Sequence, residues 1–427
     1  MRRIHQILQT LQISQISRIF SLMCILGLMS AGAAAGQGRA SVLAGFFPYQ
    51  DGFPQVEGIT PGMTLDSSTA QLATEVLPPE IVRYVEAGDF SVTIRETTDT
   101  PLRQAFIDAT VQHAAGVTLG EGTLGNYVAG RPFPVVEVGD PQAGLKMAWN
   151  HRYRDQGETA LMWASNGLRN GSGTVEREQR FLFSFKHGMH RPASDENVAP
   201  WQKQGVFSKQ YTMMVAPSDS EGNQILSVLY NDDRLANDQW AYDPKTRRTR
   251  KIVYNPYVSP GNGVVLIEDR SGFLGYIHDY DWTYLGRRVV LTPGPIKAAE
   301  PTWGGRGTWY LTDPWELRHA DVLEMTPKNS HPLYSRRLLY LDVQTSVPLF
   351  ALAYDHDGNH KRTFLLVYRH PDYNPWDNAE WFPQTAAQAS IDYQLEMSNT
   401  FQIFKIFHNR PMSDTQFSVM TLMLKGK

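Results

Sequence analysis

Residues 338–369 constrain the fold more than any other stretch of this 427-residue chain. They contain three apolar runs separated by two short segments, Asp342 to Thr345 and Asp357-Gly358. Asp and Thr side chains can hydrogen-bond to the backbone of a turn, and Asp-Gly tolerates the positive φ angles of a tight hairpin. The stretch therefore predicts three consecutive antiparallel strands.

The middle strand of this meander is apolar on both sides. From Val347 to Tyr354, hydrophobic residues fill both alternating sets of positions. Successive side chains of a strand point to opposite faces, so both faces of this strand must be covered. We expect the core on one face and a covering helix or a cavity wall on the other, with Phe350, Leu352 and Tyr354 as candidate wall residues.

Helices are expected early in the chain and strands late. Proline positions and apolar spacing predict helices over 77–88 and 101–116, and Asp140-Pro141 begins a third. From Thr159 onward the apolar pattern has a period of two, as in strands. A hairpin is expected over 240–254 and further strands at 282–291, 320–326, 390–396, 400–407 and 416–424. This order predicts a mainly β fold, a large curved antiparallel sheet or incomplete β-barrel with a few helices packed in its concavity.

The first 35 residues have the layout of a secretory signal peptide. Arg2 and Arg18 precede an apolar run over 19–29 that ends in small residues. A membrane anchor is the alternative, but a spanning helix needs about 20 apolar residues and this run is shorter. Cys24 lies inside the run and is the one cysteine of the chain, so no disulfide is expected after cleavage.

The rest of the chain is predicted to form one domain. Residues 36–76 are rich in Gly and Pro and are expected to be an extended segment on the surface, followed by a single domain over 77–427. The Pro-rich stretches 293–314 and 370–385 carry too many large apolar groups for flexible linkers, so we expect them to pack on the body.

Neither the charge nor the motifs indicate nucleic-acid binding or catalysis. Cleavage after residue 35 leaves 37 basic and 43 acidic side chains, which argues against a nucleic-acid partner. No nucleophile elbow, phosphate-binding loop or H-E-x-x-H motif occurs, so we expect no enzyme and no cofactor. His187 with His190, and the cluster from His278 to Asp281, lack the spacing of a known metal motif.

Aromatic residues are the candidates for ligand binding. A curved sheet with helices inside it often leaves an apolar gap, and such gaps stay dry and accept apolar guests. Ordinary core positions are the alternative for each residue. The candidates for a cavity lining are Trp149, Trp163, Tyr211, Trp282, Phe350, Leu352 and Tyr354.

A second set of residues is expected to contact a partner. Arg248 and Arg250 lie on one face of a strongly basic strand, which could bind anionic headgroups or an acidic protein. A solvated strand whose charges prevent edge pairing is the alternative. Tyr373 and Trp376, on a late loop, complete this set.

Seven runs, at 77–90, 140–154, 240–251, 280–288, 313–325, 334–345 and 368–376, include WAYDPKTRRTRK and DPWELRHADVLEM. In this order they resemble a bacterial family of exported proteins of unknown function, often labelled outer-membrane lipoprotein-sorting-like. The resemblance implies a fold similar to periplasmic lipoprotein carriers, with an incomplete barrel closed by helices around an apolar cavity. It also implies a location in the periplasm or at the outer membrane, often near genes for efflux-type transporters. Residues 40–66 have no match.

Two functions compete on these grounds. The first is a periplasmic carrier or chaperone that binds a lipid, a lipidated protein or an apolar metabolite, and that could serve an efflux-type transporter. The alternative is a non-enzymatic accessory subunit that docks on an envelope complex and binds no small ligand.

Overall fold

The computed structural model describes residues 38–193, 198–259, 263–376 and 382–425, so the expected signal peptide lies outside the described residues. Among the helices of the described part, none is long and apolar enough to cross a membrane.

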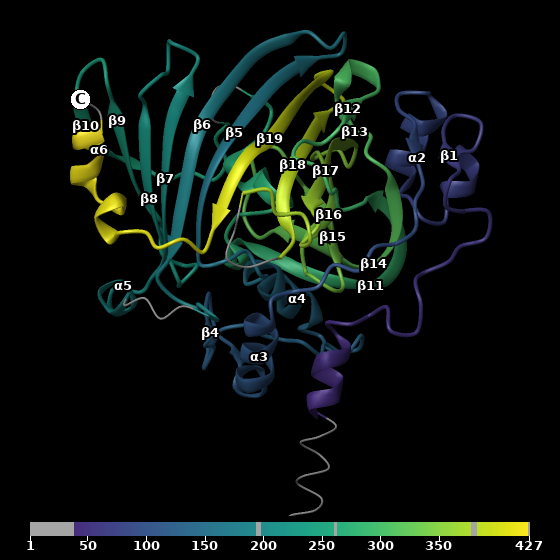
Figure 1. The fold of residues 1–427 in the computed structure, drawn as a ribbon, viewed down its shortest axis with the longest axis horizontal. Helices are drawn as coiled ribbons and strands as arrows, with labels where there is room; N and C mark the ends of the chain where they lie inside the picture. Colours follow the sequence, from purple (N-terminus) through teal and green to yellow (C-terminus); the bar gives the residue numbers. More distant parts are fainter. Residues whose placement is uncertain (1–37, 194–197, 260–262, 377–381, 426–427) are drawn as a thin grey trace, which may run out of the picture.

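A single antiparallel sheet of 13 strands forms the body of the protein, in the order β10-β9-β8-β7-β6-β5-β19-β18-β17-β16-β15-β14-β11 (Figure 1). Its strands are β5 (Thr159–Asn170), β6 (Val175–His187), β7 (Val206–Ala216), β8 (Gln224–Tyr230), β9 (Asp238–Asp243), β10 (Arg248–Val253), β11 (Tyr280–Pro293), β14 (Trp315–Pro327), β15 (Arg336–Asp342), β16 (Pro348–Tyr354), β17 (His360–Arg369), β18 (Gln384–Asp392) and β19 (Met397–His408). The sheet is unclosed, because β10 and β11 are its two ends. The expected large curved sheet is thus confirmed.

The sheet consists of two meanders that join at one seam. Strands β5 to β10 follow one another along the chain, and β14 to β19 do the same on the other side. At the seam, β19 pairs with β5 from Met397↔Asn170 to His408↔Ala160. The two meanders therefore share one continuous surface, although their strands are far apart in sequence.

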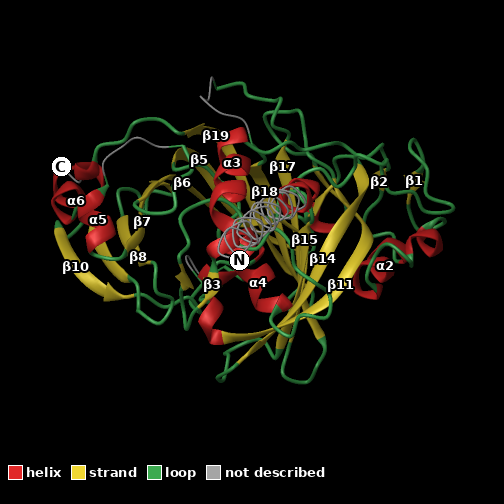
Figure 2. Cartoon of the chain, turned by 90° about the horizontal axis from the view of Figure 1, so that it is seen from below, coloured by secondary structure: helices red, strands yellow, loops and turns green. Residues whose placement is uncertain are grey.

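Helices lie on both faces of the sheet. They are α2 (Pro79–Glu86), α3 (Gln104–His113), α4 (Ala143–Arg152), α5 (Ala199–Lys203) and α6 (Val419–Lys425), with a further helical segment over 38–44. Figure 2 shows the sheet curving around α4, while α2 and α6 lie outside the curve. Three two-stranded sheets, β1 (Thr64–Leu65) with β2 (Val92–Thr93), β3 (Thr118–Leu119) with β4 (Leu124–Gly125) and β12 (Trp303–Gly304) with β13 (Tyr310–Leu311), complete the fold. The concavity thus holds α4, as expected, and α2 covers the convex side.

A glycine lets α4 approach the sheet closely. A Cβ at Gly144 would collide with the carbonyl of Trp282 on β11, so only glycine fits between helix and strand. Trp149, on the same helix, is 1% exposed in the core that fills this part of the concavity. The helix begins at Ala143 with Gln142 at its N-cap, two residues later than Pro141 suggested.

The central strand β16 is buried on both faces, as its sequence predicted. All seven of its residues are buried. Ala351 and Ala353 belong to the concave core with α4, whereas Phe350 and Leu352 belong to the convex core with α2. The predicted turns are also present, because Asp342 Oδ1 accepts hydrogen bonds from the backbone N and the hydroxyl of Thr345, both at 2.8 Å.

The strand expected over 416–424 is wrong, and the one expected over 390–396 ends at Asp392, the last residue of β18. Residues 416–424 form most of α6, and Leu422 of that helix is buried against the convex side of the β7–β9 strands. Its apolar residues suit either structure, and tertiary contacts select the helix. Residues 393–396 form the turn between β18 and β19.

The segment 264–282 covers one half of the concave face. Its residues Leu266, Phe273 and Ile277 pack on the concave side of β14 to β17. Its start is fixed to the seam, because Asn399 Oδ1 on β19 accepts the backbone N–H of Val264 at 2.8 Å. Beyond this point lies the concave face of the β5–β8 half.

Candidate functional site

A row of aromatic side chains follows the concave side of β6. Phe181, Phe183, Phe185 and His187 occupy alternate positions and therefore point to one face of the strand. Ring centroids are 6.3 Å apart between Phe183 and Phe185, and 4.7 Å between Phe185 and His187. We call these four residues the aromatic row.

The neighbouring strands extend the row into a broad apolar surface. Residues paired across β5 and β6 share a face, and the register places Met162 opposite Phe183 and Ala164 opposite Phe181. On β19, Phe401 lies 6.3 Å from Phe181, ring to ring. We call this surface the apolar floor; it consists of Ala160, Met162, Ala164, Phe181, Phe183, Phe185, Phe401, Ile403 and Ile406.

The apolar floor is partly uncovered, unlike the other half of the concave face. Phe181, Phe183 and Phe401 are only half-buried. By contrast, Leu339 and Phe364, at equivalent concave positions under the 264–282 segment, are 0% exposed. Large apolar side chains left half-open inside a curved sheet form a surface on which an apolar molecule can be buried.

One aromatic side chain packs on this floor from a loop. Trp376 lies against the apolar floor and is half-buried. The guanidinium carbon of the buried Arg369 lies 4.7 Å from the centroid of the Trp376 ring, which holds the indole in place. The loop after β17 therefore contributes to the site.

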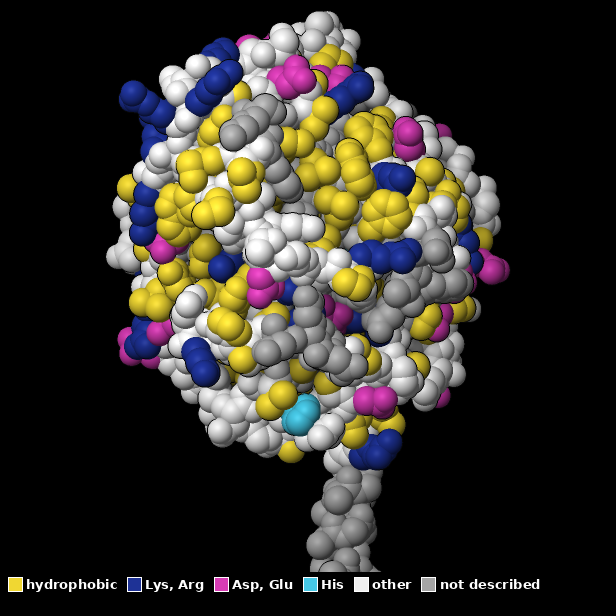
Figure 3. Space-filling view, turned by 60° about the vertical axis from the view of Figure 1, so that its left-hand side comes forward, with side chains coloured by type: hydrophobic (Ala, Val, Ile, Leu, Met, Phe, Trp, Pro, Cys, Tyr) yellow, Lys and Arg dark blue, Asp and Glu magenta, His cyan; other side chains and the backbone are white. Residues whose placement is uncertain are grey.

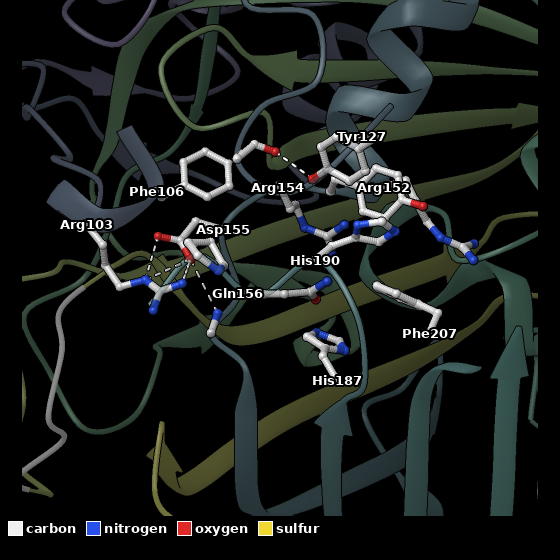
Figure 4. A pocket seen from close by; sticks show the side chains of 14 residues that line it. Arg103, Phe106, Tyr127, Arg152, Arg154, Asp155, Gln156, His187, His190 and Phe207 are labelled. Carbon is white, nitrogen blue, oxygen red and sulfur yellow. Dashed lines mark hydrogen bonds and ion pairs between the residues drawn. The ribbon is translucent and has the colours of Figure 1, made fainter. Parts of the chain in front are cut away.

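A pocket lies at the end of the aromatic row (Figure 4). Its cavity volume is about 20 Å³, which is room for one small polar group. His187 links it to the row, because the His187 ring stacks at 4.8 Å on Phe207, which also lines the pocket. The rest of the lining comes from residues 103–106, 127–130, 152–157 and 190–192, which flank α3, α4 and the end of β6.

Charged side chains make this pocket different from the floor. Arg103 binds Asp155 at 2.6 Å and Glu158 at 3.0 Å. Arg152 binds Asp233 at 3.2 Å. Burial, reinforced by nearby arginines, lowers the pKa of His187 to about 3, so this imidazole is neutral. The pocket therefore combines ion pairs with a neutral histidine.

The seven residues predicted to line a cavity do not lie together. Trp149 and Trp282 belong to the concave core at α4, while Phe350, Leu352 and Tyr354 belong to the convex core, where the Tyr354 hydroxyl donates to Glu80 at 2.8 Å. Tyr211 is buried under α6, and Trp163 is half-buried on the convex face. Alternation showed that β16 needs cover on both faces, but not which face is concave.

The predicted partner contacts also fall in two places. Arg248 and Arg250 are exposed on β10, at one end of the sheet. Tyr373 is half-buried, and Trp376 packs against the apolar floor. The aromatic row itself was missed, although Phe-x-Phe-x-Phe-x-His is a clear signal for one apolar strand face.

Fold and site together define an unclosed β half-barrel whose concave face carries a half-open apolar surface and a charged pocket. The chain belongs to the DUF1329 family, described as proteins of unknown function, whose model matches residues 64–417. The family resemblance seen in the sequence is thereby confirmed. No curated protein matches the chain.

Several solved structures are similar to this chain at low identity. A putative outer membrane lipoprotein-sorting protein domain from Vibrio parahaemolyticus is 18% identical, with a TM-score of 0.47 over 66% of this chain and 100% of that one. A DUF1329 family protein from Desulfovibrio piger is 17% identical, with a TM-score of 0.47 over 66% and 98%. A LolA superfamily protein from Nitrosomonas europaea is 14% identical, with a TM-score of 0.39 over 67% and 100%.

Proposed function

We propose that this protein is an exported, non-enzymatic carrier that binds a hydrophobic molecule on the apolar floor. The half-burial of Phe181, Phe183 and Phe401 inside the curve of the sheet is the observation that carries this proposal. A ligand chain laid on such a surface gains about 0.8 kcal/mol for each buried CH₂ group. A long acyl chain or an apolar metabolite therefore needs few polar contacts to be held.

The location of this carrier is the bacterial periplasm. The N-terminal sequence supports export, and the family resemblance supports a role in the cell envelope. A carrier in this space would move a lipid, a lipidated protein or an apolar compound between membranes or toward a transporter.

Two phenylalanines of β19 give a matched test. Phe401 and Phe407 are both half-buried, but Phe401 belongs to the apolar floor and Phe407 lies on the opposite face, paired with Leu161. Phe401→Ala should weaken binding of a neutral solvatochromic dye by roughly tenfold, because it removes a large part of the contact area, and Phe407→Ala should not. Dye fluorescence titrations measure both.

Purification from a periplasm provides an independent measurement. Native mass spectrometry should find apolar compounds bound to the intact wild-type protein and less of them on Phe401→Ala. A ligand-free mass together with no dye binding would rule out the carrier function.

A second candidate function is docking on an envelope complex. Figure 3 shows hydrophobic and basic side chains gathered on the side of the molecule that carries β10 and α6. On these two elements, Met420 and Met423 of α6 and Arg248 and Arg250 of β10 are exposed. Such a mixed surface suits a protein partner with acidic groups.

Charge reversal on β10 distinguishes the docking function from the carrier function. The double variant Arg248→Glu/Arg250→Glu should lose a crosslinked envelope partner and keep dye binding, because neither arginine belongs to the apolar floor. An unchanged crosslinking pattern would argue against docking through this surface.

A further inference from the structure

The aromatic row leads from the apolar floor directly into the charged pocket. From Phe181 to His187 the row covers about 20 Å of extended strand, comparable with the length of a long acyl chain. Its last member, His187, is 8% exposed and lines the pocket. Phe185, the member before it, is also 8% exposed, so the uncovered part of the row ends at Phe183, and a molecule lying there would point one end toward the pocket.

Three arginines line this pocket, against one carboxylate, Asp155. Two of the arginines are neutralised, since Arg103 binds Asp155 and Glu158, and Arg152 binds Asp233. The third, Arg154, makes no ion pair with a carboxylate in the described part of the chain. It is therefore the arginine of the pocket without a direct carboxylate partner among the described residues, although Arg103, with two carboxylates, leaves one negative charge in excess nearby.

Arg154 is also deeply buried. It is 9% exposed, and its Nη1 donates to the carbonyl oxygen of His151 at 2.8 Å. Burial lowers the pKa of Arg154, and the nearby Arg152 acts in the same direction. A buried cation with only neutral acceptors is costly, and an anion in the pocket would remove that cost.

A second group in the pocket lacks a partner. The Nδ1 atom of His187 is buried and makes no hydrogen bond within the residues that the structure describes. Buried polar atoms are nearly always satisfied, so an unpaired one beside a pocket is available to hydrogen-bond a bound molecule. Figure 4 shows His187 and Arg154 among the side chains that surround the space.

We propose that this pocket binds the anionic headgroup of a single-chain amphiphile whose tail lies along the aromatic row. Arg154 supplies the charge, and His187 supplies a hydrogen bond. The inference rests on the proposed carrier function and narrows it to acidic amphiphiles, whose headgroup is a carboxylate or a phosphate.

A competition experiment tests the headgroup separately from the tail. The protein is loaded with a neutral solvatochromic dye, which is then displaced by hexadecanoic acid, by its methyl ester or by a palmitoyl lysophosphatidic acid. Hydrogen bonds to charged groups favour the anions, so at least one acid should displace the dye at a roughly tenfold lower concentration than the ester does. The tighter of the two acids identifies the headgroup as carboxylate or phosphate.

Variants assign the preference to the pocket. Arg154→Met should remove the preference for the acids and leave ester binding unchanged, whereas Arg180→Met, an exposed arginine elsewhere on β6, should keep it. Circular dichroism verifies folding. If Arg154→Met does not fold, His187→Phe provides the second test: it keeps a ring in the row and should also reduce the preference for the acids.

The outcomes distinguish the two proposals. Equal displacement by acid and ester would overturn the headgroup site while the carrier function stands. A preference for acids that survives in both folded variants would also overturn it. Failure of the dye and of all three amphiphiles to bind would reject the carrier function, and the headgroup site with it.

Discussion

Buried histidines tie the stability of this protein to pH. Burial lowers the pKa of His187 and of His408 to about 3, with Arg191 contributing for the first and Arg103 for the second. In the unfolded chain both have ordinary values near 6.5. Below that value the unfolded state binds protons that the folded state does not, so stability falls as the pH drops from about 6.5 toward 3.

We expect acidification from pH 7.5 to 5 to lower the free energy of unfolding by about 2 kcal/mol for each of these histidines. His408→Phe removes the contribution of His408, so the variant should lose less stability between the two pH values than the wild type. Urea denaturation at both pH values measures the difference. Identical losses in the two proteins would contradict the assignment to His408.

Residue-level prediction from sequence succeeded where alternation alone decides. Strand β16 needed cover on both faces, and it has it. Whether Phe350 or Trp163 points to the concave or the convex side depends on the curvature of the whole sheet, which no local pattern encodes. The half-burial of Phe183 was equally unpredictable, because it depends on the 264–282 segment starting at β19 and covering only the β14–β17 half.

At the scale of elements, that segment is held by a buried ionic cluster. Arg337 on β15 donates to Asp269 at 2.6 Å and to Glu268 at 3.1 Å, and Arg362 on β17 reaches Asp269 at 3.3 Å. All these side chains are almost fully buried. The cluster fixes irregular backbone over the β14–β17 half and thereby defines where the apolar floor begins.

Removal of one partner should therefore be expensive. Arg337→Met leaves the buried Glu268 without its arginine and Asp269 with Arg362 alone, and should cost about 3–5 kcal/mol of unfolding free energy. Its neighbour Arg336 forms a part-exposed ion pair with Glu324 and stacks on Tyr354, so Arg336→Met should cost about 1 kcal/mol. Urea denaturation of both variants checks this, and equal losses would contradict the role of the cluster.

Elements with strong local signals were predictable, and those set by distant contacts were not. The Asp342 and Asp243 turns follow from side-chain chemistry, and in both the Asp carboxylate accepts bonds from the following residues. The terminal segment 416–424 contains enough apolar residues for a strand. Its helix is stabilised by Leu422 packing on strands that precede it by about half of the chain.

For the whole molecule, the order of elements predicted the fold class, but it did not predict the order of the strands in the sheet. The meander over 338–369 was predicted, but no local pattern indicates that β19 pairs with β5. That pairing creates the apolar floor, since Phe401 and Phe181 come from strands at opposite ends of the sheet-forming chain. The apolar floor therefore exists only because the two meanders pair at the seam, and no single segment of the sequence contains it.

The seam between β19 and β5 also affects how this chain folds. One edge of β5 stays unpaired until β19, near the C-terminus, is available. A chain made from its N-terminus therefore carries an open strand edge until most of it has been made. Pairings between distant segments form slowly and expose aggregation-prone surface meanwhile. We therefore expect the folding yield to depend on folding helpers, because the surface that would hold a ligand is the last part of the sheet to be completed.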